Sequence, residues 1–299
     1  MPVNQDFEQI SNLLMYGVMT SYAIGMFLFA GSFAQARDIA TNPSAGRKLG
    51  NVAMSVTTLG TILLGASILF RALSAHRVPW GNMYEFAMTG TFGVMIAMLV
   101  FSYRKDVRWL GIFITVPALL TLMIAMLVFY TASAELVPAL KSYWLLIHVT
   151  AAIVSAGAFT IGAVAAVLFL IAKRYEARQS SGVALDWRDR IALRVPNSQQ
   201  LDQIAYKVNA FTFPLWTFTI VAGAIWARAA WSRYWGWDPK ETWSFITWVG
   251  YAAYLHARVT VGWKGTRATA IGLVAYSSLI FNFTIVNLFF SGLHTYSGK

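Results

Sequence analysis

Apolar runs of about 20 residues recur along the whole chain of 299 residues, and this recurrence limits the possible folds more than any other feature. A helix of that length crosses a hydrocarbon core of about 30 Å. The sequence predicts about eight such spans, at roughly 12–34, 50–72, 84–103, 109–132, 143–172, 207–230, 242–258 and 268–291. The seventh is short and begins with polar residues, so its signal is the weakest. We therefore expect an all-α, polytopic transmembrane helical bundle.

Composition agrees with a membrane protein and excludes several soluble classes. Hydrophobic residues make up 58% of the chain and charged residues only 12%, whereas soluble domains have about 25% charged residues. This excludes a disordered chain, a small disulfide scaffold and, despite the net charge of +11, a nucleic-acid-binding module. Because Cys is absent, the chain forms no disulfide, no thiolate metal site and no covalent haem attachment of its own. Any thiol chemistry must come from a partner.

The chain is expected to form one integral membrane domain over residues 1–299. No internal repeat and no Pro- or Ser-rich linker divides it. Near the N-terminus, Asp6 and Glu8 stand where a cleavable signal peptide would have basic residues, so the first apolar run is expected to stay as a helix.

The positions of Lys and Arg predict how the helices are oriented. With the N-terminus outside, inner loops at about 35–49, 104–108, 173–207 and 258–267 hold 16 of the 23 basic residues. The positive-inside rule favours this arrangement over its inverse. Both termini, and the loop between the sixth and seventh spans, are then expected on the outer face.

Six of the twelve Trp residues are crowded into residues 226–248, which are expected to form a Trp-rich loop on that outer face. Aromatic belts form at membrane interfaces in any case, but a belt needs only one or two rings per helix end. Within the loop, Asp238-Pro-Lys-Glu241 has the pattern of a helix start, with Asp as the N-cap and Pro at the first helical position. A rigid turn of this kind would present flat indole rings to a large planar ligand.

The four His residues are the candidate metal ligands. His148 lies near the outer end of the fifth span and His294 just beyond the outer end of the eighth, level with the Trp-rich loop. Two neutral imidazoles on opposite sides of a planar cavity are what a six-coordinate haem iron needs. His256 lies about 22 Å deeper than Glu241 along the seventh span, where an ionisable residue is a functional candidate. His76 lies in an outer loop. For each His, an ordinary hydrogen-bonded role in a helix bundle is the alternative.

At these residues the sequence resembles the CcsA-type (ResC-like) cytochrome c assembly proteins of System II, within the wider haem-handling family that includes CcmC and CcmF. The segment Trp235-Gly-Trp-Asp-Pro-Lys-Glu-Thr-Trp243 is similar to the family's "WWD" signature, although Gly236 stands where Ser or a similar residue is usual. Further similar segments are Tyr254-Leu-His-Ala-Arg258, Asn82-Met-Tyr-Glu85, Ser142-Tyr-Trp-Leu-Leu-Ile-His148-Val and Asn287-Leu-Phe-Phe-Ser-Gly-Leu-His294-Thr-Tyr296.

The resemblance implies a haem-binding loop on the outer face with two axial ligands, which fall on His148 and His294. It also implies an intramembrane His that meets haem before export, which falls on His256. Fused relatives have a second such His in a ResB-like half that this chain lacks, so a separate ResB-like membrane partner is implied. The implied cofactor is haem b, bound non-covalently and transiently. The other implied partners are apocytochrome c and thiol-reducing pathway proteins, with no nucleic acid.

Together these features predict a protein that exports or presents haem and supports its covalent attachment to C-x-x-C-H apocytochromes. It would be a component of a System II cytochrome c synthase of the haem lyase type, active with its ResB-like partner in a bacterial plasma membrane or a thylakoid membrane. No catalytic residue is predicted, because the chain positions its cofactor. The candidate haem contacts are Arg228, Trp231, Arg233, Tyr234, Trp235, Trp237, Asp238, Glu241 and Trp243, with Arg228, Arg233 and Lys240 as candidate propionate partners. The candidate iron ligands are His148, His294, His256 and His76.

Two other functions stay open at this point. One is a bis-His electron-transfer subunit of a membrane quinol-oxidising complex, which would normally place its His pairs face to face inside the bilayer. The other is a transporter or scaffold without haem that uses the Trp-rich loop as an interface.

Overall fold

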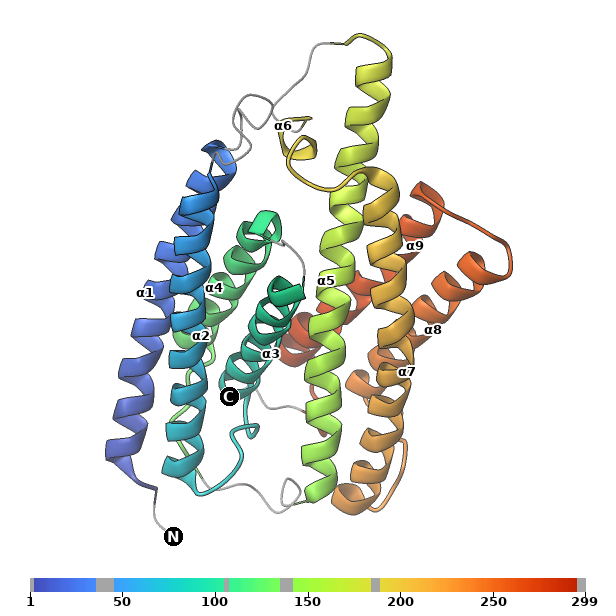
Figure 1. Cartoon of the computed structure of the whole chain (residues 1–299). Helices are drawn as coiled ribbons and strands as arrows, with labels where there is room; N and C mark the ends of the chain where they lie inside the picture. The colour runs from blue at the N-terminus through green and yellow to red at the C-terminus, as the bar shows by residue number, and fades with distance from the viewer. Residues whose placement is uncertain (1–2, 36–45, 105–107, 135–141, 184–188, 295–299) are drawn as a thin grey trace. The chain divides into compact units, whose positions relative to one another are not determined.

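The structure is a computed structural model that describes residues 3–35, 46–104, 108–134, 142–183 and 189–294. Within these ranges every regular element is a helix, so the all-α prediction is confirmed (Figure 1). The chain forms two compact units, Met1–Val137 with Gly298–Lys299, and Pro138–Ser297. Of the residues named above, Tyr296 lies outside the described ranges, as do parts of the loops expected at 35–49, 104–108 and 173–207.

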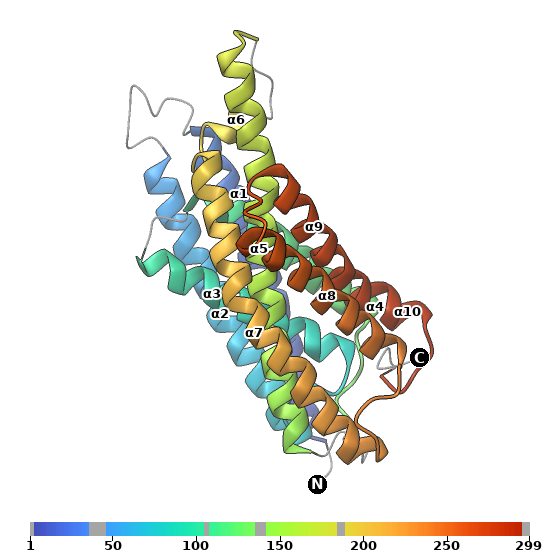
Figure 2. The ribbon, with the colours of Figure 1, turned by 90° about the vertical axis from the view of Figure 1, so that its right-hand side faces the viewer.

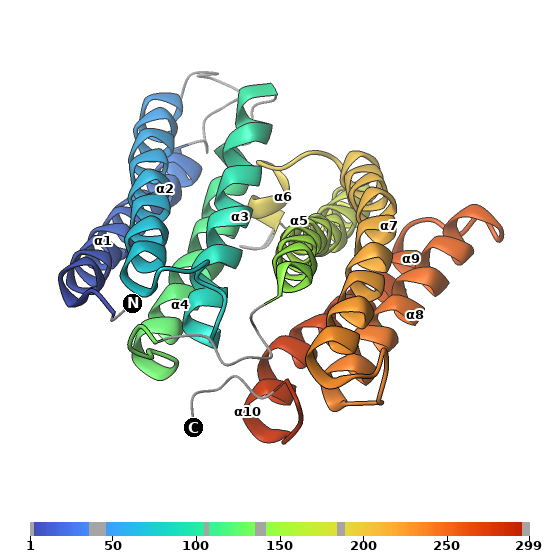
Figure 3. The same cartoon turned by 90° about the horizontal axis from the view of Figure 1, so that it is seen from below.

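The first unit contains four long helices and one short turn. These are α1 (Gln5–Gln35), α2 (Arg47–Ala75), α3 (Met83–Arg104), η2 (Arg108–Leu110) and α4 (Gly111–Val128). Both α1 and α3 pack against α2 and α4, as the view along the helices shows (Figure 3). Small residues let α1 and α2 approach closely, since a Cβ on Gly60 would lie 2.7 Å from the Tyr22 ring. Close backbone approach of this kind is how helices associate where lipid leaves no hydrophobic driving force between them.

The second unit contains the remaining helices. These are α5 (Tyr143–Ser180), α6 (Asp189–Ala192), α7 (Ser198–Trp231), α8 (Pro239–Val259), α9 (Thr266–Phe281), the π-helical turn η4 (Asn282–Val286) and α10 (Asn287–Phe289). α7 packs along α5 and against α8, and α9 lies beside α8 (Figure 2). Aromatic rings fill the core between them, with Phe159 stacked on Tyr251 at 3.7 Å. Side chains cap the N-termini of α5, α7 and α8, from Ser142, Asn197 and Asp238 respectively.

All eight predicted spans fall on helices, and seven helical stretches are long and apolar enough to cross a membrane. The exception is α8, which covers the predicted seventh span and begins with Pro239, Lys240 and Glu241. The weakest signal in the sequence therefore belongs to the helix with the least apolar composition.

Two boundaries differ from those expected. The polar segment 173–207, expected as a loop, is largely helical, because α5 continues to Ser180 and α7 already begins at Ser198 behind its Asn197 cap. The fourth span, expected to reach residue 132, ends at Val128. The backbone that follows has no regular secondary structure, and its polar groups bind distant side chains, as described below for Thr131, Ser133 and Ala134.

Candidate functional site

The Trp-rich segment is mostly helical, and only residues 232–238 form the turn between α7 and α8. The turn is tight, because Ser232 and Trp237 both have left-handed backbone angles, with φ of 59° and 56°. Non-glycine residues rarely adopt this conformation. The carboxylate of Glu241 holds the turn in place by accepting the backbone N–H groups of Gly236 at 2.8 Å and Asp238 at 3.1 Å. The side chain of Glu241 therefore positions the turn by binding the backbone of the turn.

Asp238 connects the start of α8 to the last described residues of the chain. Its Oδ1 accepts the backbone N–H of Lys240 at 3.1 Å, and its Oδ2 accepts the backbone N–H of Leu293 at 2.8 Å. The same Oδ1 lies 3.0 Å from Nδ1 of His294. Burial raises the pKa of the Asp238 carboxyl, but the bonds from His294, Leu293 and Lys240 outweigh it and hold the pKa below its usual value. Asp238 is thus an ionised acceptor, and His294 donates its Nδ1–H to it.

His148 is held by a different kind of partner. Its Nδ1 lies 2.9 Å from the backbone carbonyl oxygen of Thr219 on α7. A carbonyl oxygen only accepts, so Nδ1 is the protonated nitrogen and Nε2 is an acceptor. Gly223 makes this contact possible, because a Cβ at that position would lie 2.7 Å from Cε1 of His148.

The two imidazoles meet at the same indole ring. Trp226, only 1% exposed, is nearly parallel to His148 with ring centroids 5.9 Å apart. His294 contacts Trp226 edge-on at 5.5 Å and Trp231 at 4.7 Å. Helix packing therefore brings together four rings from the start of α5, the end of α7 and the segment after α10.

Four other candidate haem contacts lie on or beside the turn. Tyr234 and Trp237 are exposed, with Trp235 edge-on to Trp237 at 5.7 Å. The guanidinium of Arg228 lies 6.0 Å from the ring of Tyr234 and donates to the carbonyl of Ser232.

Two further predicted contacts pack against neighbouring residues. The guanidinium of Arg233 lies against Gly236, where a Cβ would stand, but it is the far end of an exposed, flexible side chain and does not by itself require glycine there. Trp243 packs against Phe281 of α9 at 4.1 Å, so the structure does not bring it to the His pair.

The other two His residues lie apart from this cluster. His256 is exposed on α8, opposite the buried face formed by Thr247, Tyr251 and Tyr254, and its Nδ1 lies 3.4 Å from the Thr260 hydroxyl. His76 belongs to the first unit, where it ends α2 with a left-handed φ of 51°. Its backbone N–H bonds to carbonyls of the last turn, so its position has a structural explanation as a helix C-cap.

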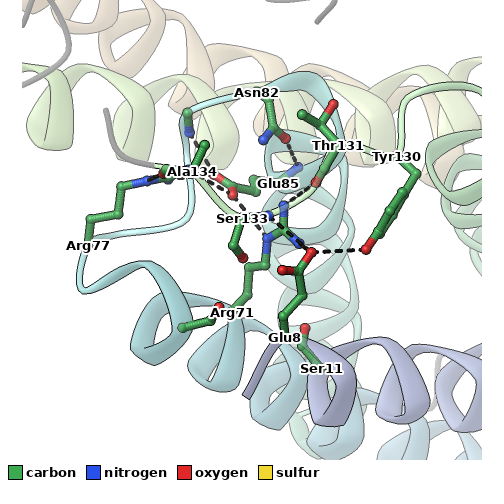
Figure 4. Close-up of polar contacts among 12 residues, drawn as sticks. Glu8, Ser11, Arg71, Arg77, Asn82, Glu85, Tyr130, Thr131, Ser133 and Ala134 are labelled. Carbon is green, nitrogen blue, oxygen red and sulfur yellow. Dashed lines mark hydrogen bonds and ion pairs between the residues drawn. The ribbon is translucent and has the colours of Figure 1, made fainter. Parts of the chain in front are cut away.

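The first unit contains a buried charge network at the end of α2 (Figure 4). Arg71 and Glu85 are fully buried, and Nε of Arg71 lies 3.1 Å from Oε1 of Glu85. Arg77 binds both oxygens of Glu85, at 2.7 and 3.0 Å. Glu8 of α1 accepts from Arg71 at 3.3 Å. Glu85 of the segment 82–85 is thus a structural partner of two arginines.

Backbone groups complete this network. Arg71 also donates to the carbonyl of Thr131, and Arg77 donates to that of Ala134 at 2.8 Å. Glu8 accepts from the Tyr130 hydroxyl and from the backbone N–H of Ser133, both at 3.0 Å. These contacts hold residues 130–134 in place without regular secondary structure.

Sequence reasoning did not identify several residues of the His cluster. Trp226 stood out only as part of the Trp-rich segment and Gly292 only as part of the segment 287–296, and neither Thr219 nor Gly223 stood out. Gly223 and Gly292 had a recognisable signal, since glycine marks close approach, and Gly292 leaves room for the carboxylate of Asp238. Thr219 had none, because its backbone carbonyl is the group that binds.

The sequence model of the family described as "Cytochrome C assembly protein" matches residues 80–294. That range includes His148, His256, His294 and the whole α7–α8 turn, but not His76.

Several curated proteins named "Cytochrome c biogenesis protein CcsA" are similar over most of their length. That of Guillardia theta is 33% identical over 258 residues, covering 83% of this chain and 84% of the relative. That of Prochlorococcus marinus is 33% identical over 256 residues, covering 79% and 80%. That of Trieres chinensis is 30% identical over 321 residues, covering 97% and 98%.

Proposed function

Because the chain belongs to the cytochrome c assembly family and acts in cytochrome c biogenesis as an integral membrane protein, we propose that it presents haem between His148 and His294. The haem is the substrate of the assembly reaction, and this chain holds it for attachment to an apocytochrome c. The Trp-rich turn is proposed to face the outer side of the membrane, and the bound form is proposed to be non-covalent haem b.

The state of the two imidazoles is the observation that supports this proposal most strongly. Each Nδ1–H donates to a fixed acceptor, the Thr219 carbonyl for His148 and the Asp238 carboxylate for His294. In the neutral form of each ring, Nε2 is then the nitrogen that would bind iron. Metal-binding His residues have this arrangement, in which the second nitrogen is held by a carboxylate or carbonyl that fixes the tautomer and the ring orientation.

The surrounding residues fit a planar, dianionic substrate. Trp226 and Trp231 provide apolar aromatic surface beside both imidazoles, and Tyr234 and Trp237 add exposed rings on the turn. Arg228 at the end of α7 and Arg233 on the turn provide positive charge for the two propionates. Two axial His ligands would keep the iron six-coordinate until the acceptor arrives.

The covalent chemistry requires no nucleophile from this chain. Each reduced thiol of a C-x-x-C-H acceptor adds its S and H across one haem vinyl C=C bond, which forms a thioether and releases nothing. A positioned haem and two reduced thiols are sufficient, so the contribution of this chain is binding and orientation. Thiol-reducing partner proteins would keep the acceptor thiols reduced, and a ResB-like partner would complete the System II synthase.

His256 is proposed to serve an earlier stage, when haem enters the protein. It lies on the face of α8 opposite the buried one, where a second membrane protein could supply a further ligand. Since α8 extends over 21 residues from Pro239, His256 is too far from its N-terminal turn to bind the same iron as His294.

An optical spectrum tests the central proposal. Purified protein should show the Soret band of bis-His haem, and His148→Ala with His294→Ala together should abolish it while the protein stays folded. Co-expression with a C-x-x-C-H acceptor should yield covalent haem only with the intact pair. A wild-type protein without a Soret band would exclude the proposal, and quinol oxidation without thioether formation would favour the electron-transfer alternative.

A reporter test addresses the orientation. Fusions after Ser180 and after Lys240 should give opposite compartment signals, because 16 of the 23 basic residues lie in the proposed inner loops. Identical signals would exclude the proposed orientation.

A further inference from the structure

The two proposed iron ligands differ in the partner that holds each of them. His294 donates its Nδ1–H to an ionised carboxylate, Asp238, at 3.0 Å. His148 donates to a neutral backbone carbonyl, that of Thr219, at 2.9 Å. The distances are nearly equal, so the difference lies in the charge of the acceptor.

The acceptor of His148 is also shared. Thr219 lies within α7, which continues unbroken to Trp231, and a helix carbonyl accepts the N–H of the residue four positions later. The Thr219 carbonyl therefore serves both Gly223 and His148. A carboxylate has about four acceptor positions, and that of Asp238 accepts from Lys240, Leu293 and His294 and, in the capping box, from the backbone of Glu241.

We propose that His294 is the retained axial ligand, that His148 is the ligand exchanged for the His of the incoming apocytochrome, and that Asp238 is the positioning residue that sets this order. The inference rests on the bis-His function proposed above and names which of the two iron bonds breaks.

The physical reason is electron donation through the imidazole. A hydrogen bond to a carboxylate is charge-assisted and stronger than one to a neutral carbonyl, and it increases the basicity of the opposite ring nitrogen. Nε2 of His294 is therefore the stronger donor to iron. Loss of such an outer partner typically lowers metal affinity about 10- to 100-fold.

The contacts that anchor His294 and His148 also favour His294 as the retained ligand. The side chain of Asp238 is 5% exposed and that of His294 is 13% exposed. The carboxylate binds both the ring of His294 and the backbone N–H of Leu293 beside it, so the ring and its chain segment are fixed together. Among the described residues, the ring of His148 makes one polar bond, to the Thr219 carbonyl.

Haem retention by single-ligand variants tests the order. His148→Ala and His294→Ala are each loaded with haem in the presence of imidazole, which is then removed, and haem loss to excess apomyoglobin is followed by absorbance. His148→Ala, which keeps the Asp238-bound ligand, should lose haem about 10-fold more slowly than His294→Ala. Equal rates, or the opposite order, would overturn the proposal.

Asp238→Asn then identifies the cause. Asn is also a good N-cap, so α8 keeps its start while the negative charge is removed. In the His148→Ala background, Asp238→Asn should accelerate haem loss to the rate of His294→Ala. In the His294→Ala background, Asp238→Asn should leave the rate of haem loss unchanged. Together these variants form a double-mutant cycle. Asn197→Ala, which removes the α7 cap and contacts neither imidazole, is the control for a merely structural effect. Equal acceleration in both backgrounds would give Asp238 a structural role and overturn its assignment.

The reduction potential of the bound haem provides a second measurement. In the otherwise wild-type protein, Asp238→Asn should move the reduction potential of bound haem in the positive direction, because the negative charge beside His294 stabilises ferric iron. An unchanged potential would contradict the proposal. If wild-type protein binds no haem at all, the proposed function itself fails, and its missing Soret band distinguishes that result from an incorrect order of ligands.

Discussion

The buried charge network of the first unit and the His–Trp cluster of the second both lie at helix ends, but they differ in the hydrogen-bond partners that hold their polar groups. In the network, every nitrogen of Arg71 and Arg77 that can donate has an acceptor, and both oxygens of Glu85 accept. In the cluster, Nδ1 of His148 is fixed by a backbone carbonyl and Nδ1 of His294 by a carboxylate.

The comparison distinguishes stabilising groups from binding groups. Charges removed from water must be paired, so a network whose members satisfy one another contributes to the fold and has no capacity for a ligand. An imidazole fixed through Nδ1 beside aromatic rings instead has the arrangement of a metal-binding His, which is the role proposed above for His148 and His294. This criterion gives Glu85 and the two His residues different roles, although all three lie in segments that resemble the same family.

The largest expected effect on stability comes from breaking the network. Glu85→Gln keeps the shape of the side chain but leaves two buried guanidinium groups with one carboxylate, Glu8. We expect a loss of about 3–5 kcal/mol in the free energy of unfolding, measured by denaturation in detergent. Glu176→Gln, at an exposed carboxylate bonded to Ser198, should cost less than about 1 kcal/mol. Equal losses would contradict the structural role of Glu85.

Removing one ligand should give the opposite result, with an intact fold and little haem. In His148→Ala or His294→Ala, haem affinity should fall about 10- to 100-fold, because one of two iron bonds is lost. The haem-to-protein ratio measures this, and added imidazole should partly restore it by filling the vacated coordination position. Full occupancy without imidazole would leave that His with a structural role alone.

A change at Gly223 affects the same cluster through packing. In Gly223→Ala the new methyl group would lie 2.7 Å from the ring of His148, so the imidazole must move from the Thr219 carbonyl. We expect a loss of about 1–3 kcal/mol in the free energy of unfolding together with an altered haem spectrum. Gly90→Ala is the matched control, because no atom lies within 4 Å of its added Cβ. An unchanged spectrum in Gly223→Ala would show that the position of the His148 ring does not govern binding.

The smallest expected effect on the folded protein comes from His256. Since its side chain is exposed on α8, His256→Ala should leave the amount of protein unchanged. It should lower haem at the outer site several-fold, with partial restoration by imidazole, if haem enters through this residue. A reduced protein level with a normal haem-to-protein ratio would instead assign His256 a structural role.

Much of the architecture could be predicted because it depends on short stretches of sequence. Each spanning helix requires only an apolar run of sufficient length, and the start of α8 requires only Asp238, Pro239 and Glu241 in the right order. The boundaries that moved have an equally clear reason. Residues 129–132 are apolar enough for a helix, but the distant side chains of Arg71 and Glu8 bind the backbone around them.

The sequence by itself determined the helical class, the spans, the capped turn before α8 and the choice of His148 and His294 as candidate ligands. Only the tertiary structure decided that Thr219 holds His148, that Asp238 holds His294 and that Trp226 contacts both rings. The reason is the range of the interactions. Helix length and capping depend on neighbours within a few residues, whereas these contacts join residues 71 and 56 positions apart. The packing of α5, α7 and the segment after α10 creates them, and hydropathy and local motifs do not encode that packing.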